Sequence, residues 1–241
     1  SDVYKRQASG AVLGLNQIEA AECVKATNEK YAKILGINVA ARTTTIKPSG
    51  TASCVVGSSS GIHAWHSQYY IRRIRVGKNE AMYRYVKTKF PELVEDCVFK
   101  PHLESVISIP QKAPAGAIVR TESAFDLLER VKKFNLEWVQ GGYRSGKNQH
   151  NVSCTISLHP EEWDAVGDWM WNNRDSYTGI SVLPFDGGSY QQAPFEDCTK
   201  GEYDRLMQFC HEIDLTQVIE SEDGTNLSGE LACAGGACVV V

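Results

Sequence analysis

The chain has 241 residues, of which 42% are hydrophobic and 22% are charged, and its formal net charge is −4 at pH 7. This composition is typical of a globular protein with one large domain or two small ones, and the weak negative charge gives no electrostatic basis for binding nucleic acid. The sequence contains no apolar run long enough to span a bilayer and no signal peptide, so we expect neither a membrane protein nor a secreted one.

The distribution of the cysteines indicates the cellular compartment of the protein. Six of its eight cysteines are scattered through segments predicted to be regular, which is typical of buried thiols in a reducing compartment and predicts a cytoplasmic protein.

The first residue is serine, and residues 1–7 join abruptly to a stretch rich in glycine and alanine. We therefore interpret the chain as truncated at its N-terminus.

Residues 15–35 predict a long helix that ends at Gly36, because glycine readily takes the left-handed conformation just beyond a helix. The apolar stripe expected on this helix consists of Ile18, Cys23, Ala26, Tyr31 and Ile34.

The stretch 43–65 has the organisation of an anion-binding turn. The β-branched run 43–46 predicts a strand, which Pro48 ends because proline has no N–H for pairing. Residues 49–51 form a short turn, and residues 52–56 fit the first turn of a helix. Free N–H groups and the positive end of the dipole at such a helix start attract anions.

The same turn also carries side-chain donors, namely Ser49, Thr51 and Ser53, together with the charge of Lys47. It is therefore a candidate phosphate site, although the Gly-Lys-Ser/Thr ending of a Walker loop is absent. A capped helix start without a ligand is the alternative interpretation.

Residues 57–61 predict a flexible loop, and His63, Trp65 and His66 follow it directly. Residues 69–76 alternate apolar and basic side chains, which is typical of a strand with one solvated face. The basic residues of this strand are Arg72, Arg73 and Arg75. We expect them to lie in solvent, with steering of an anionic nucleotide or cofactor as the alternative.

The rest of the chain alternates helices and strands. Helices are predicted over 79–90, over 123–139, from Pro160 through Trp171, and over 199–213; strands are predicted over 105–109, 151–158 and, as a buried type, 179–185. Ser123 with Asp126 and Thr199 with Glu202 predict capping boxes at two of the helix starts. This alternation predicts an α/β fold with largely parallel strands over 8–220, followed by a flexible tail over 221–241.

Cys233 and Cys238 lie close together in this tail, with Ala-Gly-Gly-Ala between them. Glycine lets the chain bend until the two Cα atoms approach disulfide distance, about 5.5 Å. An exposed pair on a flexible segment suits thiol–disulfide exchange, whereas a structural zinc site needs four ligands. We therefore predict a redox-active pair and no metal site; a fortuitous pair is the alternative.

Several motifs in order resemble one enzyme family. They are KPSGT at 47–51, SSSGIHAWH at 58–66, YYIRRIRV at 69–76, ISVLPFDGGSYQQAPFED at 180–197 and CAGGAC at 233–238. Together they resemble the ribonucleotide reductases, specifically the adenosylcobalamin-dependent (class II) ribonucleoside-triphosphate reductases. The resemblance implies a ten-stranded α/β barrel of two parallel halves, to which this chain contributes the C-terminal part.

The resemblance also implies a function. Ribonucleoside triphosphates would be converted to 2′-deoxyribonucleoside triphosphates by thiyl-radical chemistry that adenosylcobalamin starts. The residues implied in binding the substrate phosphates are Pro48, Ser49, Gly50, Thr51, Ala52 and Ser53. Cys233 and Cys238 would reduce a buried disulfide formed in each turnover, and thioredoxin or a similar dithiol would then reduce this tail pair.

The chain departs from the family at the radical site, because it has no Asn-Pro-Cys-x-Glu-like motif. We therefore predict no catalytic residue within the chain and no reductase activity of the chain alone, and we interpret Cys54 and Cys154 as core thiols. Candidate contacts to cofactor or substrate are Lys47, His63 and His66, with solvated histidines as the alternative. The loop expected to face the site contains Gln191, Gln192 and Pro194.

Two alternative functions remain open at this point. One is a fragment of another reductase class, either iron-dependent and diphosphate-specific or glycyl-radical; the other is a non-catalytic nucleotide-binding fragment. The cysteine pair near the C-terminus argues against the glycyl-radical class. The position of Tyr69 and Tyr70, just after the phosphate turn, argues against the iron-dependent class.

Overall fold

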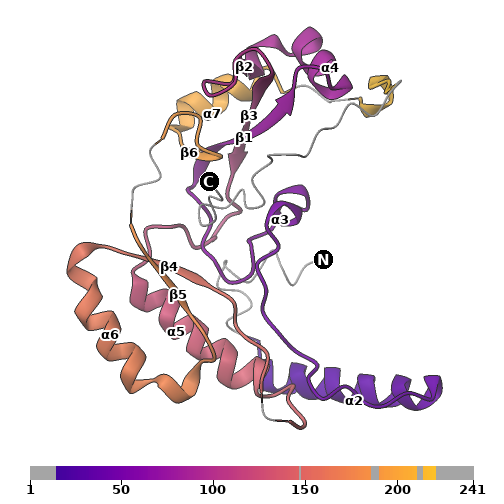
Figure 1. Ribbon diagram of the computed structural model, residues 1–241, viewed down its shortest axis with the longest axis vertical. Helices are drawn as coiled ribbons and strands as arrows, with labels where there is room; N and C mark the ends of the chain where they lie inside the picture. The colour runs from indigo at the N-terminus through magenta and orange to yellow at the C-terminus, as the bar shows by residue number, and fades with distance from the viewer. Residues whose placement is uncertain (1–14, 147, 186–189, 211–213, 221–241) are drawn as a thin grey trace. The chain divides into compact units, whose positions relative to one another are not determined.

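The computed structural model describes residues 15–146, 148–185, 190–210 and 214–220 (Figure 1). The chain divides into two compact units, the first within Ser1–Trp65 and Ala115–Phe185 and the second within His66–Pro114 and Asp186–Val241. Each unit has a hydrophobic core of its own. Among the described residues, no helix is both long enough and apolar enough to cross a membrane.

Helix α2, Gln17–Leu35, opens the first unit as the sequence predicts. The Asn16 side chain accepts a hydrogen bond from the Glu19 N–H at 3.1 Å, which satisfies one of the free donors of the first turn. Gly36 ends the helix in the left-handed conformation, with φ +64°.

The buried face of α2 is not the predicted apolar stripe. Three residues of that stripe are more than half exposed: Ile18, Tyr31 and Ile34. Ala21 and Ala32 are buried instead, on the side that packs against η3, the π-helix Asn135–Val139. A Cβ placed on Gly141 would lie 2.8 Å from the Ala21 Cβ, so the close approach of the backbones selects small residues here.

The core of the first unit lies between two helices and a parallel strand pair (Figure 1). Helix α5, Ala124–Phe134, begins with the predicted capping box of Ser123 and Asp126. Strand β4, Thr155–Leu158, pairs in parallel with β5, Ser181–Pro184. The connection between the strands consists of η4 (Pro160–Glu162), α6 (Trp163–Asn172) and η5 (Arg174–Ser176). The side chains packed between these elements include Leu128, Val131, Ile156, Leu158 and Val166, all nearly inaccessible to solvent.

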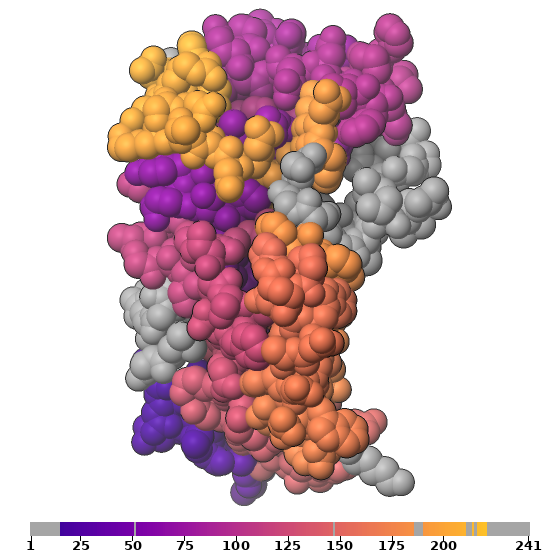
Figure 2. Space-filling view, turned by 90° about the vertical axis from the view of Figure 1, so that its left-hand side faces the viewer, coloured from indigo at the N-terminus to yellow at the C-terminus, as the bar shows by residue number. Residues whose placement is uncertain are grey.

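Two strand predictions in this unit need correction. Residues 43–46 are extended but make only an isolated parallel bridge, between Ile46 and Val152, and the Thr44 hydroxyl donates to the Trp138 carbonyl at 2.6 Å. Strand β5, which the sequence predicts to be fully buried, is only partly buried. The segment around α6 forms part of the molecular surface (Figure 2), where Trp171 is 70% exposed.

The second unit is built on a four-stranded antiparallel sheet of order β2-β3-β1-β6. Its strands are β1 (Tyr69–Gly77), β2 (Val94–Asp96), β3 (Glu104–Lys112) and β6 (Phe195–Asp197). Its helices are α4 (Ala81–Lys89), η2 (Pro91–Leu93), α7 (Lys200–Met207) and η6 (Leu215–Gln217), and α7 begins with the predicted capping box. Val76, Val86, Phe90, Ile107 and Leu206 are buried together in its core.

The described strands and helices agree with the predicted α/β class, but the prediction of largely parallel strands is wrong for the second unit. Only β4 and β5 pair in parallel among the named strands that the structure describes. The solvated basic face predicted for β1 is also wrong, because Arg72 is buried while Ile74 is 44% exposed. The ten-stranded barrel stays a prediction, and the predicted tail over 221–241 lies outside the described residues.

Candidate functional site

The predicted phosphate turn is a tight, exposed start of a short helix in the first unit (Figure 1). Helix α3, Thr51–Val55, begins after Gly50, whose φ of +53° lies in the region that glycine adopts without strain. The Ser49 N–H donates to the Ser60 hydroxyl oxygen at 3.1 Å, and the Ala52 N–H donates to the Ser49 carbonyl at 3.2 Å. The turn is therefore closed by its own backbone and by one serine of the following loop.

The donors left over in this turn are backbone groups. No described residue accepts a hydrogen bond from the N–H of Gly50 or of Ser53. The Ser53 hydroxyl is buried and donates to the Gly50 carbonyl at 2.7 Å, so it is committed within the turn. Lys47 and Ser49 are exposed. Free N–H groups at a helix start, next to an exposed lysine and an exposed serine, form a surface that suits an oxyanion.

The loop that follows α3 packs directly beneath the turn. Gly61 has φ +61°, and a Cβ placed on it would lie 3.4 Å from the Pro48 nitrogen, so the two backbones approach closely. The His63 Nδ1 lies 2.9 Å from the Ser60 carbonyl, and its Nε2 accepts a hydrogen bond from the Thr155 N–H at 3.0 Å. The loop is thus tied to the start of β4 through a single imidazole ring.

These two hydrogen bonds determine the state of His63. An Nε2 that accepts and an Nδ1 that donates to a carbonyl require the neutral ring with its proton on Nδ1. Burial lowers the pKa of His63 below its usual value, which favours the same neutral form. Both ring nitrogens are therefore engaged within the protein, and a polar contact from His63 to a cofactor or substrate would have to break one of these bonds.

A buried ion pair, which was not predicted from the sequence, supports the other end of the loop. Arg130 of α5 is 6% exposed and forms a two-pronged pair with the Glu122 carboxylate, with Nη1 at 3.1 Å from Oε1 and Nη2 against Oε2. The same Nη1 donates to the Ile62 carbonyl at 3.0 Å. Position 130 falls on the buried side of an amphipathic helix, where a charged residue without a partner would be costly. That conflict was the one signal that could have located the pair.

The remaining predicted site residues lie elsewhere. His66 belongs to the second unit, where its Nε2 lies 3.1 Å from Asp197 Oδ1 and its ring stacks on Phe195 at a centroid distance of 5.6 Å. Cys233 and Cys238 lie outside the described residues. Within the parts of the chain that are described, no group of histidine, cysteine and acidic side chains is arranged to hold a metal ion.

The two cysteines interpreted as core thiols differ from each other. Cys154 is buried, and burial raises the pKa of its thiol to about 12, so it is protonated at neutral pH. Cys54 on α3 is exposed, so its interpretation as a core thiol is wrong. Residues 52–56 were predicted to be helical, but α3 is too short to bury more than one side, and that side carries Ser53.

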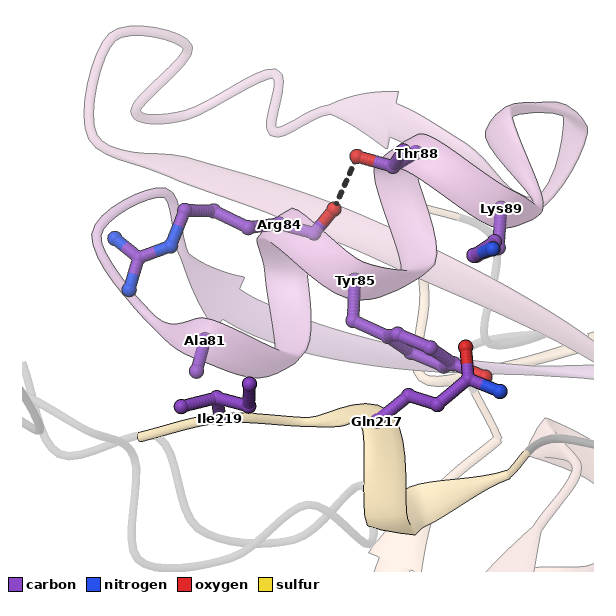
Figure 3. Close-up of a pocket in the computed structure, with 7 residues that line it drawn as sticks. All are labelled: Ala81, Arg84, Tyr85, Thr88, Lys89, Gln217 and Ile219. Atoms are coloured by element: carbon purple, nitrogen blue, oxygen red, sulfur yellow. Dashed lines mark hydrogen bonds between the residues drawn. The ribbon is translucent and has the colours of Figure 1, made fainter. Parts of the chain in front are cut away.

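The second unit has a shallow pocket of about 270 Å³ on one face of α4 (Figure 3). The residues that line it are Ala81, Arg84, Tyr85, Thr88, Lys89, Gln217 and Ile219. The Arg84 guanidinium donates to the Asn79 carbonyl at 2.9 Å, and the Thr88 hydroxyl donates to the Arg84 carbonyl at 2.7 Å. None of the residues predicted for the phosphate site is among these described lining residues.

Comparison with known proteins tests the family resemblance. No family model matches the chain. The adenosylcobalamin-dependent ribonucleoside-triphosphate reductase of Lactobacillus acidophilus is 28% identical over 224 residues, which cover 91% of this chain and 29% of the relative. The protein of the same name from Lactobacillus gasseri is 29% identical over 243 residues, covering 99% of this chain and 31% of the relative.

A solved structure agrees with these relatives. The crystal structure of a B-12 dependent (class II) ribonucleotide reductase is similar to 80% of this chain and 26% of that chain, with a TM-score of 0.67 and 26% sequence identity. The resemblance to the class II reductases is confirmed. The chain spans about three tenths of the length of the reductases it matches, so it corresponds to one region of a larger enzyme.

Proposed function

We propose that this chain is the C-terminal part of an adenosylcobalamin-dependent ribonucleoside-triphosphate reductase, and that its turn at residues 47–53 binds the triphosphate of the substrate. The relatives support the family. The observation that carries the phosphate site is the turn itself, where the N–H groups of Gly50 and Ser53 have no acceptor among the described residues. The whole reaction belongs to the larger enzyme, and this region contributes binding and electron delivery to it.

The proposed phosphate-binding residues are Pro48, Ser49, Gly50, Thr51, Ala52 and Ser53, with Lys47 at the edge of the turn. We propose different roles for these residues. Gly50 and Ser53 offer backbone N–H groups, and the exposed Ser49 offers its hydroxyl. Pro48 and Gly50 shape the turn, because proline ends the extended segment and glycine takes the positive φ. The Ser53 side chain stabilises the turn from inside.

Adenosylcobalamin is the cofactor named for the relatives, and it would start the radical chemistry. The described residues do not identify its site. His63 has both ring nitrogens engaged, and His66 lies against the Asp197 carboxylate. We therefore assign no described residue to the cobalamin. We also propose no radical role for Cys154, which is buried and protonated, or for Cys54.

Cys233 and Cys238 are the proposed redox-active pair. Reduction at C2′ of the ribose releases the hydroxyl as water and takes two electrons from a dithiol, which becomes a disulfide. The tail pair would reduce that disulfide by thiol exchange and become a disulfide itself, and a thioredoxin-class dithiol would return it to the reduced state. The same reducing chemistry fits a cytoplasmic protein.

The phosphate site is tested by Ser49→Ala with Thr51→Ala in the full-length reductase. Each charge-assisted hydrogen bond lost costs about 1.5–3 kcal/mol, so the double variant should bind substrate at least tenfold more weakly. Thr88→Ala is the control, because it removes a surface hydroxyl of α4 that donates to the Arg84 carbonyl. Unchanged substrate affinity in the double variant would show that neither hydroxyl binds the phosphates.

A further inference from the structure

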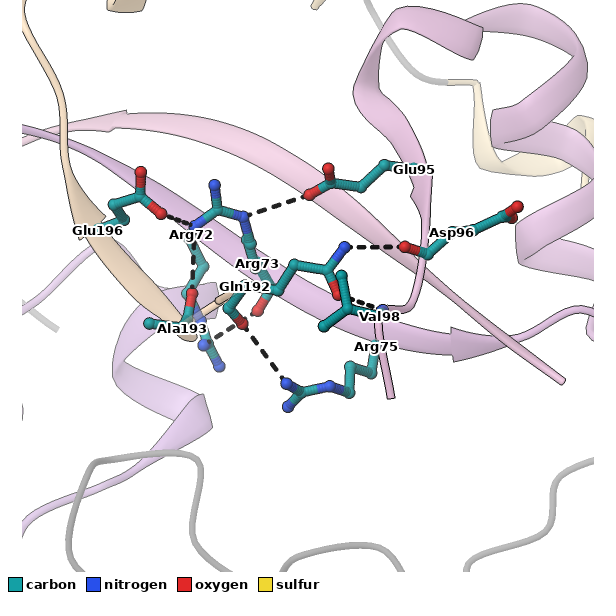
Figure 4. Close-up of polar contacts among 9 residues, drawn as sticks. All are labelled: Arg72, Arg73, Arg75, Glu95, Asp96, Val98, Gln192, Ala193 and Glu196. Carbon is teal, nitrogen blue, oxygen red and sulfur yellow. Dashed lines mark hydrogen bonds and ion pairs between the residues drawn. The ribbon is translucent and has the colours of Figure 1, made fainter. Parts of the chain in front are cut away.

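Residues 190–194, here called the strap, lead into β6 beside β1 of the second unit. Three successive strap carbonyls accept hydrogen bonds from arginine side chains of β1, and Figure 4 shows those of Gln192 and Ala193. The pairs are Arg72 Nη1 with Pro194 O at 3.0 Å, Arg73 Nη1 with Ala193 O at 3.4 Å, and Arg75 Nη2 with Gln192 O at 3.4 Å. The Pro194 carbonyl also accepts a backbone hydrogen bond from the Arg73 N–H at 2.9 Å, and the guanidinium groups extend the contact between strap and sheet to Ala193 and Gln192.

These arginines are not an anion site. Arg73 also pairs with Glu196 and lies 3.5 Å from Glu95 Oε1, so part of its charge is balanced within the unit. Arg72 is 8% exposed and lies over the Phe195 ring, with Cζ 4.5 Å from the centroid. All three arginines donate to the strap, and Arg72 is buried, so the predicted solvated basic face is wrong.

Gln192 fastens the middle of the strap to a second strand. Its Nε2 donates to the Asp96 carbonyl at 2.8 Å, and its Oε1 accepts from the Val98 N–H at 2.9 Å, so one side-chain amide fills the donor and acceptor positions at the end of β2. The side chain is 8% exposed. A side-chain amide offers an NH₂ donor and a carbonyl acceptor next to each other, as these two partners require.

The backbone conformation of Gln192 is unfavourable for a residue other than glycine. Its φ is +55°, and it is the only residue other than glycine with a positive φ among those described. The Ala193 N–H donates to the Tyr190 carbonyl at 3.1 Å, so Gln192 occupies the third position of a turn, where glycine or asparagine is favoured when φ is positive. A left-handed glutamine persists only when its surroundings hold it there.

We propose that Gln192 is a latch that holds the strap in a conformation its own backbone disfavours, and that the latch positions the strap beside β1 where it leads into β6. The carbonyl contacts from three arginines and the two amide hydrogen bonds outweigh the strain at this one residue. In the reductase, Gln192 would then be a positioning residue for the strap. That last consequence rests on the proposed function, whereas the latch does not.

The decisive variant is Gln192→Gly in the 241-residue chain, because it relieves the strain and removes the latch together. If the latch dominates, the melting temperature falls and exchange of the Val98 amide hydrogen speeds up by about tenfold or more, since two hydrogen bonds are lost. Gln191→Gly is the matched control, because that exposed neighbour loses backbone entropy but no amide bridge. An unchanged or higher melting temperature with unchanged Val98 exchange would overturn the proposal.

Exchange at Ile109, in the ladder between β1 and β3, separates local release from general unfolding. Under the proposal, the Ile109 amide keeps its protection while the Val98 amide loses it. Where Gln192→Gly fails to fold, Arg75→Gln is the milder variant, because it removes only the bond to the Gln192 carbonyl. If the Val98 amide then exchanges as slowly in Arg75→Gln as in the unmodified chain, the claim that the arginine contacts and the Gln192 latch hold the strap together is refuted.

The consequence for the reaction is measured in the full-length reductase at a temperature where each variant is folded. We expect Gln192→Gly to raise the KM for the nucleotide with kcat at saturation largely retained, and Gln191→Gly to change neither. Faster Val98 exchange in Gln192→Gly together with an unaltered KM would overturn the positioning role. A reductase that is inactive without any substitution would refute the proposed function and leave the latch standing on the exchange data.

Discussion

The buried pair of Arg130 and Glu122 gives the sharpest test of how the phosphate turn is supported. Replacing Arg130 by Met keeps most of the volume but leaves the Glu122 carboxylate, only 11% exposed, without its counter-charge. It also removes the donor to the Ile62 carbonyl. Breaking a buried pair from one side costs about 3–5 kcal/mol, and both groups here are too buried for solvent to screen that loss.

The double variant Arg130→Met with Glu122→Leu separates the cost of one unpaired buried charge from the cost of losing both charges. With both charges gone, only the Ile62 carbonyl stays unsatisfied, which costs about 1–3 kcal/mol. The double variant should therefore be more stable than Arg130→Met alone. Urea unfolding of the chain, followed by tryptophan fluorescence and by circular dichroism, gives the free energies of unfolding.

Lys133→Met on the same helix is the control. It breaks a partly exposed pair with Glu137, 2.7 Å long and four residues apart, and should cost at most about 0.5 kcal/mol. Two results would refute the reasoning: a loss of less than about 1 kcal/mol in Arg130→Met, or a double variant no more stable than the single one.

Three further predictions concern protons and thiols. The pKa of His63 is lowered in the folded chain, so its contribution to the free energy of unfolding should be complete above pH 6.5, the usual pKa of histidine, and be lost as the pH falls through the folded pKa. His63→Gln should flatten that part of the curve of unfolding free energy against pH. At about pH 8, iodoacetamide should label the exposed Cys54 readily and leave the buried Cys154 unmodified until unfolding; equal labelling would contradict the burial. In the full-length reductase, replacing Cys233 and Cys238 by Ser should preserve a single turnover, stop turnover with thioredoxin and allow partial rescue by dithiothreitol; loss of the first turnover would place the pair in the chemistry itself.

Helix ends were predictable from the sequence because capping is local. The Thr199–Glu202 capping box and Gly36 are formed by residues within one turn of the helix end they terminate, and the structure has both as predicted. The phosphate turn is likewise local, since Pro48 and Gly50 impose their backbone preferences whatever packs around them.

Burial and partnership were not predictable because they depend on distant segments. Arg72 is covered by a strap that lies about 120 positions later in the chain, so its neighbours on β1 could not show that it is buried. The acceptor role of His63 depends on Thr155, a residue 92 positions away. The alternation over 69–76 indicated a strand correctly, but a period of two says which residues share a face and not which face is wet.

The same limit explains the α2 stripe. The spacing of Ile18, Tyr31 and Ile34 fits one side of a helix, yet the approach of Gly141 selects the alanine side instead. A helical period identifies faces, and only the shape of the partner decides which of them is buried.

The central claim is that this chain works as part of a ribonucleotide reductase. The most direct measurement is single-turnover formation of 2′-deoxyribonucleoside triphosphate by the full-length protein, with adenosylcobalamin and a prereduced enzyme, alongside the isolated 241-residue chain. We predict one burst of deoxyribonucleotide from the full-length protein and none from the chain alone. A full-length protein that binds the triphosphate without forming any deoxyribonucleotide would contradict the account, as would turnover by the isolated chain.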